Sequence, residues 1–209
     1  MEHFLPDERR TPYARGLLAF TRTMRGYAMS GLQRNAEAEQ LLRSSLAEMA
    51  PVQERSVEQF RASAAYGLGD LLWRTGRHGE AVPVLRQAIT SAERGGVADD
   101  LFVQMARTRL ASAIRFYHAG STEPLRILGD SVVEVRQARL RAALGSDAGA
   151  NPADQALARA TASERSYNDP LREVFNLYLT EAARGPYRAR AGDPVFADGV
   201  FGVAQDLAA

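Results

Sequence analysis

The sequence predicts an all-α protein built from consecutive helix hairpins, and three observations support that fold class. Leu, Ala, Met and Val recur at helical spacing along nearly all of the 209-residue chain. No useful length of sequence alternates apolar and polar residues with the period of two that is typical of a strand. Related blocks of sequence recur 43 or 44 residues apart. Together these features predict an αα-hairpin solenoid with extra C-terminal helices.

Helix boundaries follow from glycine, proline and capping residues between the periodic segments. Gly120, for example, ends one predicted helix, and Thr122 is placed to cap the next, with Pro124 in its first turn. The predicted helices cover 11–31, 34–49, 54–75, 78–94, 98–119, 122–144, 153–166 and 170–184. We therefore expect three hairpins in residues 1–144, a linker over 145–152 and C-terminal helices in 153–209.

The internal repeat is the most specific signal in the sequence. The blocks that start at Tyr66 and Leu110 are 44 residues apart, and an earlier block aligns with the first of them at a displacement of 43. Small, large apolar and aromatic residues coincide in the aligned blocks: Gly26 with Gly69 and Ala113, Met29 with Leu72 and Phe116, Trp73 with Tyr117, Ala38 with Ala81, and Leu42 with Leu85. Three related hairpins are expected.

The segment from Ala65 to Ala88 resembles a tetratricopeptide repeat. The matching residues are Leu68, Gly69, Leu72, Gly76, Ala81, Leu85 and Ala88. It departs from that pattern in having Ala65 where tryptophan is usual, and its spacing exceeds the common period of about 34 residues. Such long spacing is similar to the repeats of bacterial signalling and regulatory proteins. The resemblance covers roughly residues 13 to 144 and implies a right-handed superhelix whose first helices line a concave groove.

By that resemblance, residues just beyond the small residue at each helix crossing face the groove. The candidates for partner binding are Tyr27, Asp70, Trp73, Arg74, Tyr117 and His118, with Tyr66 added from one turn earlier on the helix of Asp70. Aromatic and arginine side chains are typical of binding hot spots. Two structural alternatives stand beside this assignment. Trp73 and Tyr117 would instead pack between neighbouring hairpins, and Asp70 with Arg74 would form a solvated pair one helical turn apart.

A second resemblance concerns the C-terminal stretch from Arg190 to Leu207, which contains Gly192-Asp193-Pro194. It is similar to the connector that follows the repeats in bacterial proteins with a caspase-like CHAT peptidase domain. The resemblance implies that the chain is the N-terminal part of a longer protein. The catalytic His and Cys of that family would then lie beyond Ala209, because this sequence contains no cysteine.

Composition excludes several function classes. All 26 basic residues are arginine, so no lysine is present to form a Schiff base or to bind phosphate. The histidines His3, His78 and His118 lack the spacing of metal ligands, and no glycine-rich phosphate loop or nucleophile elbow occurs. We therefore expect a protein that is not an enzyme and has no cofactor and no metal.

Charge and hydropathy narrow the expected partners. With 26 basic and 25 acidic residues the formal net charge is +1, which favours neither nucleic acid nor an anionic membrane. No run of about 18 apolar residues could span a membrane, so a cytoplasmic location is expected. The sequence thus predicts a module that binds a protein or peptide partner. The alternatives are the regulatory region of a CHAT-type protease and a scaffold that self-associates into a homo-oligomer through uncapped ends.

Overall fold

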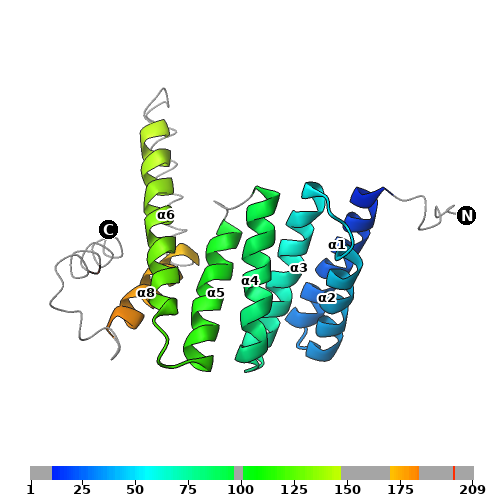
Figure 1. Ribbon diagram of the computed structural model, residues 1–209, viewed down its shortest axis with the longest axis horizontal. Coiled ribbons are helices and arrows are strands. Elements are labelled where there is room, and N and C mark those ends of the chain that lie inside the picture. The colour runs from blue at the N-terminus through cyan, green and yellow to red at the C-terminus, as the bar shows by residue number, and fades with distance from the viewer. Residues whose placement is uncertain (1–10, 97–100, 147–169, 184–199, 201–209) are drawn as a thin grey trace, which may run out of the picture. The chain divides into compact units, whose positions relative to one another are not determined.

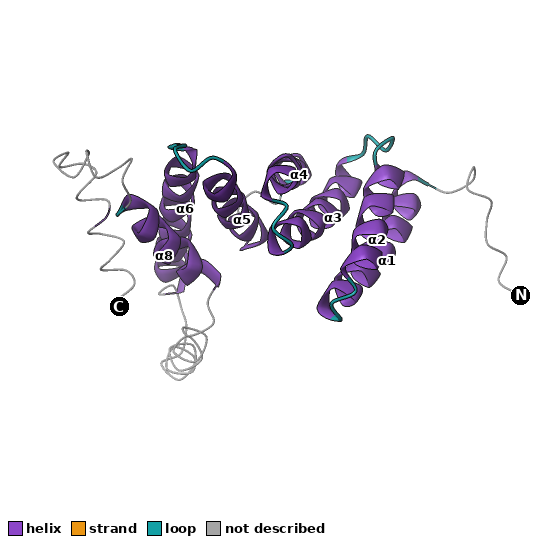
Figure 2. Ribbon diagram, turned by 90° about the horizontal axis from the view of Figure 1, so that it is seen from below, coloured by secondary structure: helices purple, strands orange, loops and turns teal. Residues whose placement is uncertain are grey.

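The computed structural model describes residues 11–96, 101–146, 170–183 and 200. Every regular element in these ranges is an α-helix, and none of the described residues lies in a strand (Figure 1, Figure 2). The helices are α1 (Pro12–Gly31), α2 (Asn35–Met49), α3 (Arg55–Arg74), α4 (His78–Gly95), α5 (Leu101–Tyr117), α6 (Glu123–Ser146) and α8 (Pro170–Ala182). The all-α prediction is confirmed for the described part of the chain.

Predicted and observed helix boundaries agree to within about three residues, as expected where capping and turn signals are strong. The largest difference is at α5, whose predicted start at 98 lies in a stretch outside the described residues. The predicted helix over 153–166, most of the linker over 145–152, and nearly all of the stretch compared with CHAT-type connectors also lie outside them.

The chain forms two compact units, Met1–Tyr117 and His118–Ala209. In the first unit α1 packs on α2 and α3, α3 packs on α4 and α5, and the second helices α2 and α4 contact α3 and α5 in turn. In the second unit α6 packs on α8. The helices of the third predicted hairpin, α5 and α6, belong to different units. The predicted third hairpin and the predicted domain division at residue 144 stay predictions.

Glycine at the crossing of each of the first two hairpins lets the paired helices approach closely. A Cβ atom added to Gly26 would lie 2.9 Å from Cγ of Leu42, and one added to Gly69 would lie 2.6 Å from Cγ of Leu85. Both leucines are fully buried. Because side chains in a core leave no room for an extra methyl group, glycine is required at both crossings. The residues aligned in the sequence thus make the same contact in both hairpins.

The turns of these two hairpins are also alike in backbone hydrogen bonding. Arg34 N–H donates to the Met29 carbonyl and Arg77 N–H donates to the Leu72 carbonyl, both at 2.9 Å. This bond closes a Schellman motif, which needs a left-handed residue after the helix. That residue is Gly76 in the second hairpin, with φ of 78°, and Gln33 in the first, with φ of 60°.

The segment between α5 and α6 is built differently. Gly120 is not among the described residues with positive φ, so this turn lacks the left-handed residue that Gly76 and Gln33 supply in the first two hairpins. The Ser121 hydroxyl accepts from Glu123 N–H at 3.2 Å, so Ser121 takes the capping role that the sequence suggested for Thr122. Two residues after Thr122 the chain has Pro124, which has no N–H to donate to a threonine hydroxyl.

Buried residues join the hairpins of the first unit. One apolar cluster (Ala19, Met49, Val52, Val57, Ala64) connects α1, α2 and α3, and another (Ala62, Ala92, Val103) connects α3, α4 and α5. A buried ion pair between Glu58 and Arg61 lies where α3 follows α2. Arg61 also donates to the carbonyls of Met49 and Val52, at 2.7 and 2.6 Å, and so holds the end of α2 to α3. Consequently α3 has packed neighbours on both sides.

None of the described helices combines the length and the hydropathy needed to cross a membrane.

Candidate partner-binding surface

Asp70, near the end of α3, lies at the centre of a polar cluster. Its Oδ2 accepts from Arg74 Nε at 2.9 Å, and its Oδ1 accepts from Arg109 Nε at 2.8 Å. Arg74 follows one turn later on α3, whereas Arg109 comes from α5. One carboxylate therefore holds two guanidinium groups, and together with Trp73 these residues form what we call the Asp70 cluster (Asp70, Trp73, Arg74, Arg109). Its net charge is positive.

Trp73 packs between α3 and α5. Its Nε1 donates to Ser112 Oγ at 3.1 Å, and the Arg109 guanidinium carbon lies 4.2 Å from the centre of the indole ring. The ring is partly buried. This position between hairpins is the one that the packing alternative anticipated. This cation–π contact stabilises both the Arg109 and the Trp73 side chains.

Arg74 extends the cluster to α1. Besides Asp70, its guanidinium donates to the hydroxyl of Ser30, near the end of α1. The pairing of Arg74 with Asp70 one turn apart, which the sequence allowed, is present. Its side chain is 37% exposed, against 20% for Asp70 and 23% for Arg109. Arg74 is therefore the member of these three charged residues that is most accessible to a partner.

The tyrosines Tyr27 and Tyr66 lie in contacts between neighbouring first helices. Tyr27 Oη donates to the Ser63 carbonyl on α3 at 2.7 Å, and its ring covers Gly67. Burial is the main reason why the pKa of Tyr27 is raised above 10.0. The Tyr66 ring meets Phe102 of α5 edge to face, with centroids 5.0 Å apart.

Tyr117 and His118 are exposed. Tyr117, at the end of α5, covers Gly79 at the start of α4, where a Cβ atom would be 2.7 Å from the ring. Next to it, Phe116 stacks on His78 with centroids 4.8 Å apart. His118 belongs to the second unit, so its position relative to the other candidates is not described. Of the predicted residues, the structure brings Asp70, Trp73 and Arg74 into one cluster.

Sequence reasoning missed Arg109 and Ser112, which contact Asp70 and Trp73 from α5. Both come 39 residues after their partners, and no motif marks that separation. One signal was available in the sequence, because the segment that forms α5 carries three arginines and no acidic residue. Arginines in such a segment must find carboxylates elsewhere or remain open to a partner.

The distribution of charge differs between the first and second helices of the hairpins. The first helices α1, α3 and α5 carry three arginines each, and their only acidic residues are Glu58 and Asp70 on α3. The second helices α2 and α4 together carry three arginines and five glutamates. A near-neutral chain thus has a basic set of first helices, which the overall net charge concealed.

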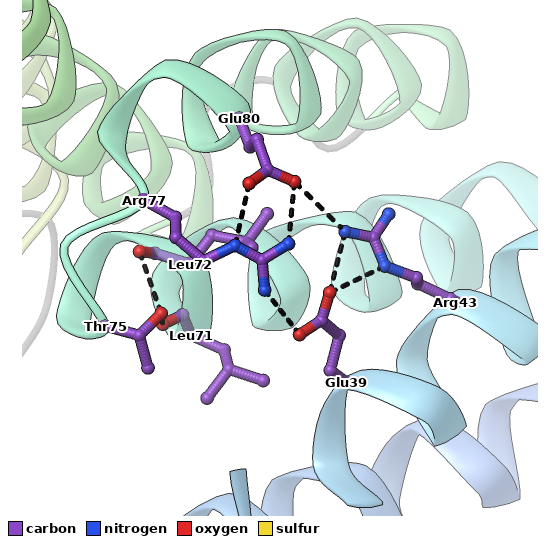
Figure 3. Close-up of polar contacts among 7 residues, drawn as sticks. All are labelled: Glu39, Arg43, Leu71, Leu72, Thr75, Arg77 and Glu80. Atoms are coloured by element: carbon purple, nitrogen blue, oxygen red, sulfur yellow. Dashed lines mark hydrogen bonds and ion pairs between the residues drawn. The ribbon is translucent and has the colours of Figure 1, made fainter. Parts of the chain in front are cut away.

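A second polar cluster lies between α2 and the start of α4, and Figure 3 shows its contacts. Arg77 donates to Glu80 from two nitrogens at 2.7 Å and to Glu39 at 2.6 Å, while Arg43 donates to Glu39 at 2.8 Å. The hydrogen bonds from Arg77 are the largest cause that lowers the pKa of both glutamates. The two arginines and two glutamates balance, so this cluster links the hairpins without leaving net charge.

No group of His, Asp and Glu side chains in the described ranges is arranged to hold a metal ion. Comparisons of the chain with protein-family models, with curated proteins and with solved structures find no match.

Proposed function

We propose that the first unit is a protein-interaction module of the tetratricopeptide type. It binds an acidic peptide, extended or helical, on the surface formed by α1, α3 and α5, and the chain acts through that partner without catalysis. The observation that carries the proposal is the Asp70 cluster, in which one carboxylate faces two arginines beside an indole ring. The repeated hairpin contacts of Gly26 and Gly69 support the superhelical arrangement that the resemblance implies.

The chemistry of the cluster favours a carboxylate ligand. Arg74 and Arg109 each use Nε on Asp70, and a guanidinium presents five N–H donors in a planar fork. A carboxylate from a peptide can accept donors of Arg74, which is the most exposed of the three charged residues. The surplus of arginine on the first helices would also speed the approach of an acidic partner.

The test is selection of random peptides from a displayed library against the full chain, followed by titration of the selected peptides. We expect them to be rich in Asp and Glu and to bind more weakly at high salt. Arg74→Glu should weaken their binding by about tenfold or more, because the substitution reverses the charge at the contact. Arg74 is chosen in place of Trp73, whose removal would also disturb the packing on α5.

The matched control is Arg94→Glu, which makes the same charge change at an exposed position on the second helix α4. It should leave binding unchanged within about twofold. If selected peptides respond equally to both substitutions, only net charge matters and the assigned surface is wrong. Failure of the library to yield acidic peptides would overturn the proposed ligand.

A further inference from the structure

The end of α5 carries two adjacent aromatic side chains that lie largely open. Phe116 is 54% exposed and Tyr117 is 56% exposed. Both contact the start of α4: Phe116 stacks on His78 with ring centroids 4.8 Å apart, and the Tyr117 ring covers Gly79. We call the side chains of His78, Phe116 and Tyr117 the α5 end patch. Large apolar groups that stay exposed side by side are typical of interaction sites.

The α5 end patch is continuous with the Asp70 cluster. Trp73 of that cluster lies 6.4 Å from His78, measured between ring centroids, and His78 in turn stacks on Phe116. The Phe116 ring is therefore within about 11 Å of the indole ring, a distance that about three or four residues of extended peptide span. One short peptide can reach both places.

We propose that the acidic peptide bound at the Asp70 cluster also carries an aromatic or large aliphatic residue that packs on Phe116 and Tyr117. This residue lies about three to five positions from the acidic one, as the distance between the two places requires. The inference rests on the proposed function, because it concerns the same peptide and adds a second determinant to its sequence. Two determinants at a fixed spacing give a specificity that an acidic residue alone does not provide.

The exposure of Arg74 explains why an apolar residue is needed. The Arg74 side chain is 37% exposed, and ion pairs at exposed sites are weak because water screens them. Packing of an apolar side chain on the α5 end patch removes apolar surface of both partners from water, and aromatic residues are frequent in binding hot spots. The acidic residue of the peptide therefore sets its position, and the apolar residue contributes most of the affinity.

The charge around the rings favours an acidic peptide over a second copy of this chain. Arg109 lies over the Trp73 ring and Arg115 over the Phe116 ring, with guanidinium carbons 4.2 and 4.6 Å from the ring centres. These distances place both cations directly against the aromatic rings. Helix α5, which contributes both arginines, has no acidic residue. Carboxylates next to the apolar residue of a peptide complement this arrangement, whereas a second copy of the patch brings the same cations again.

The probes are fluorescein-labelled peptides of about twelve residues, with two adjacent aspartates in a background of glycine and serine. One peptide has phenylalanine about four residues after the aspartates, a second has it about four residues before them, and in the third serine replaces it. Binding to the full chain is measured by fluorescence anisotropy. We expect one of the phenylalanine peptides to bind at least about tenfold more tightly than the serine peptide. Phe116→Ala and Tyr117→Ala should each remove most of that gain, because each takes away a ring that the phenylalanine contacts.

The matched control is Tyr13→Ala, the same substitution as Tyr117→Ala at a tyrosine of α1 that is 50% exposed. It should keep the full gain from phenylalanine, and Phe116→Leu should keep most of it, because leucine preserves an apolar side chain at the contact. Far-UV circular dichroism establishes that each variant is folded. Equal binding of all three peptides, or equal loss in Tyr13→Ala and Tyr117→Ala, would overturn the inference. Light scattering that shows a dimer abolished by Phe116→Ala would also overturn it, in favour of a second copy.

The two proposals fail separately. If peptides selected from the library depend on Arg74 but show no preference for an apolar residue, and Phe116→Ala leaves their binding unchanged, the inference is wrong and the proposed function stands. If the phenylalanine peptide depends on Phe116 and Tyr117 while Arg74→Glu leaves its affinity unchanged, the patch binds an apolar side chain alone. The assignment of the acidic residue to the Asp70 cluster is then wrong, and both proposals fall.

Discussion

The hairpin α1–α2 and the hairpin α3–α4 share their internal contacts and differ in their external ones. Each has glycine under a buried leucine at the crossing and a Schellman turn with the same hydrogen bonds. Each also begins its second helix with an arginine bound to the glutamate three residues later, Arg34 to Glu37 and Arg77 to Glu80. Arg77 alone continues to Glu39 of the other hairpin. The repeated contacts therefore build each hairpin, whereas the contact that joins this hairpin to its neighbour is not repeated.

The largest effect is expected where a contact that is not repeated is buried. Arg61→Ala would leave Glu58 buried without its partner and remove the donor to the Met49 and Val52 carbonyls. Breaking a buried ion pair in this way costs about 3–5 kcal/mol. We expect that loss in the free energy of unfolding measured in urea. Fluorescence of Trp73, the only tryptophan, reports unfolding of the first unit.

The comparison for Arg61 is the exposed pair of Arg34 and Glu37, whose side chains are 53% and 49% exposed. Arg34→Ala should cost less than about 1 kcal/mol. A loss for Arg61→Ala no greater than that for Arg34→Ala would mean that the buried pair does not hold the hairpins together.

The next largest effect tests the contact between glycine and leucine at the helix crossing, which both hairpins share. Gly69→Ala should destabilise the first unit by about 1–3 kcal/mol, because the added methyl group overlaps Leu85. Gly26→Ala should cost less, since its Cβ would be slightly farther from Leu42. The control is Gly31→Ala, where a Cβ atom has no neighbour within 4 Å and alanine should stabilise the helix by up to about 1 kcal/mol. Urea unfolding that ranks all three alike would contradict the crossing contact.

A smaller effect concerns Glu39, the glutamate that Arg77 links to the other hairpin. The pKa of Glu39 is lowered, so its contribution to stability is full above the ordinary value of 4.5 and is lost as pH falls through the lower folded value. Stability of the original chain should therefore decline between about pH 5 and pH 3, and Glu39→Gln should reduce that decline. Unfolding curves at each pH that show the same decline in Glu39→Gln as in the original chain would argue against the link to Arg77.

The smallest effect concerns the turns. Gln33 holds a left-handed conformation that costs a residue with a side chain about 1–2 kcal/mol. Gln33→Gly should raise thermal stability slightly, because the gain in the folded state is offset by the extra freedom of glycine in the unfolded chain. The reverse change, Gly76→Gln, should lower it by about 1 kcal/mol. A fall in melting temperature for Gln33→Gly would show that the Gln33 side chain makes a stabilising contact.

The sequence was sufficient for features that depend on neighbours within one hairpin. The helices, the crossing glycines and the pairing of Asp70 with Arg74 all follow from spacing of a few residues or from the repeat. The contacts of Arg109 with Asp70 and of Arg77 with Glu39 did not follow. They depend on how far one hairpin is rotated against the next, and that rotation is set by packing of many side chains at once. The same reason left the packing of Trp73 open as an alternative.

Helix α1 carries a stripe of apolar residues that α3 covers only in part, and this has a consequence for synthesis of the chain. The stripe consists of Tyr13, Leu17, Phe20, Met24 and Tyr27. The hairpin α1–α2 leaves the ribosome before α3, and until α3 arrives Phe20 and Tyr27 lack the cover that they have against Phe60 and Gly67. In that interval all of these apolar side chains are exposed to solvent. A nascent chain is therefore more prone to contact other chains than the finished protein is. Packing of α3 covers Phe20 and Tyr27, whereas Leu17 and Met24 remain on the surface of the folded protein.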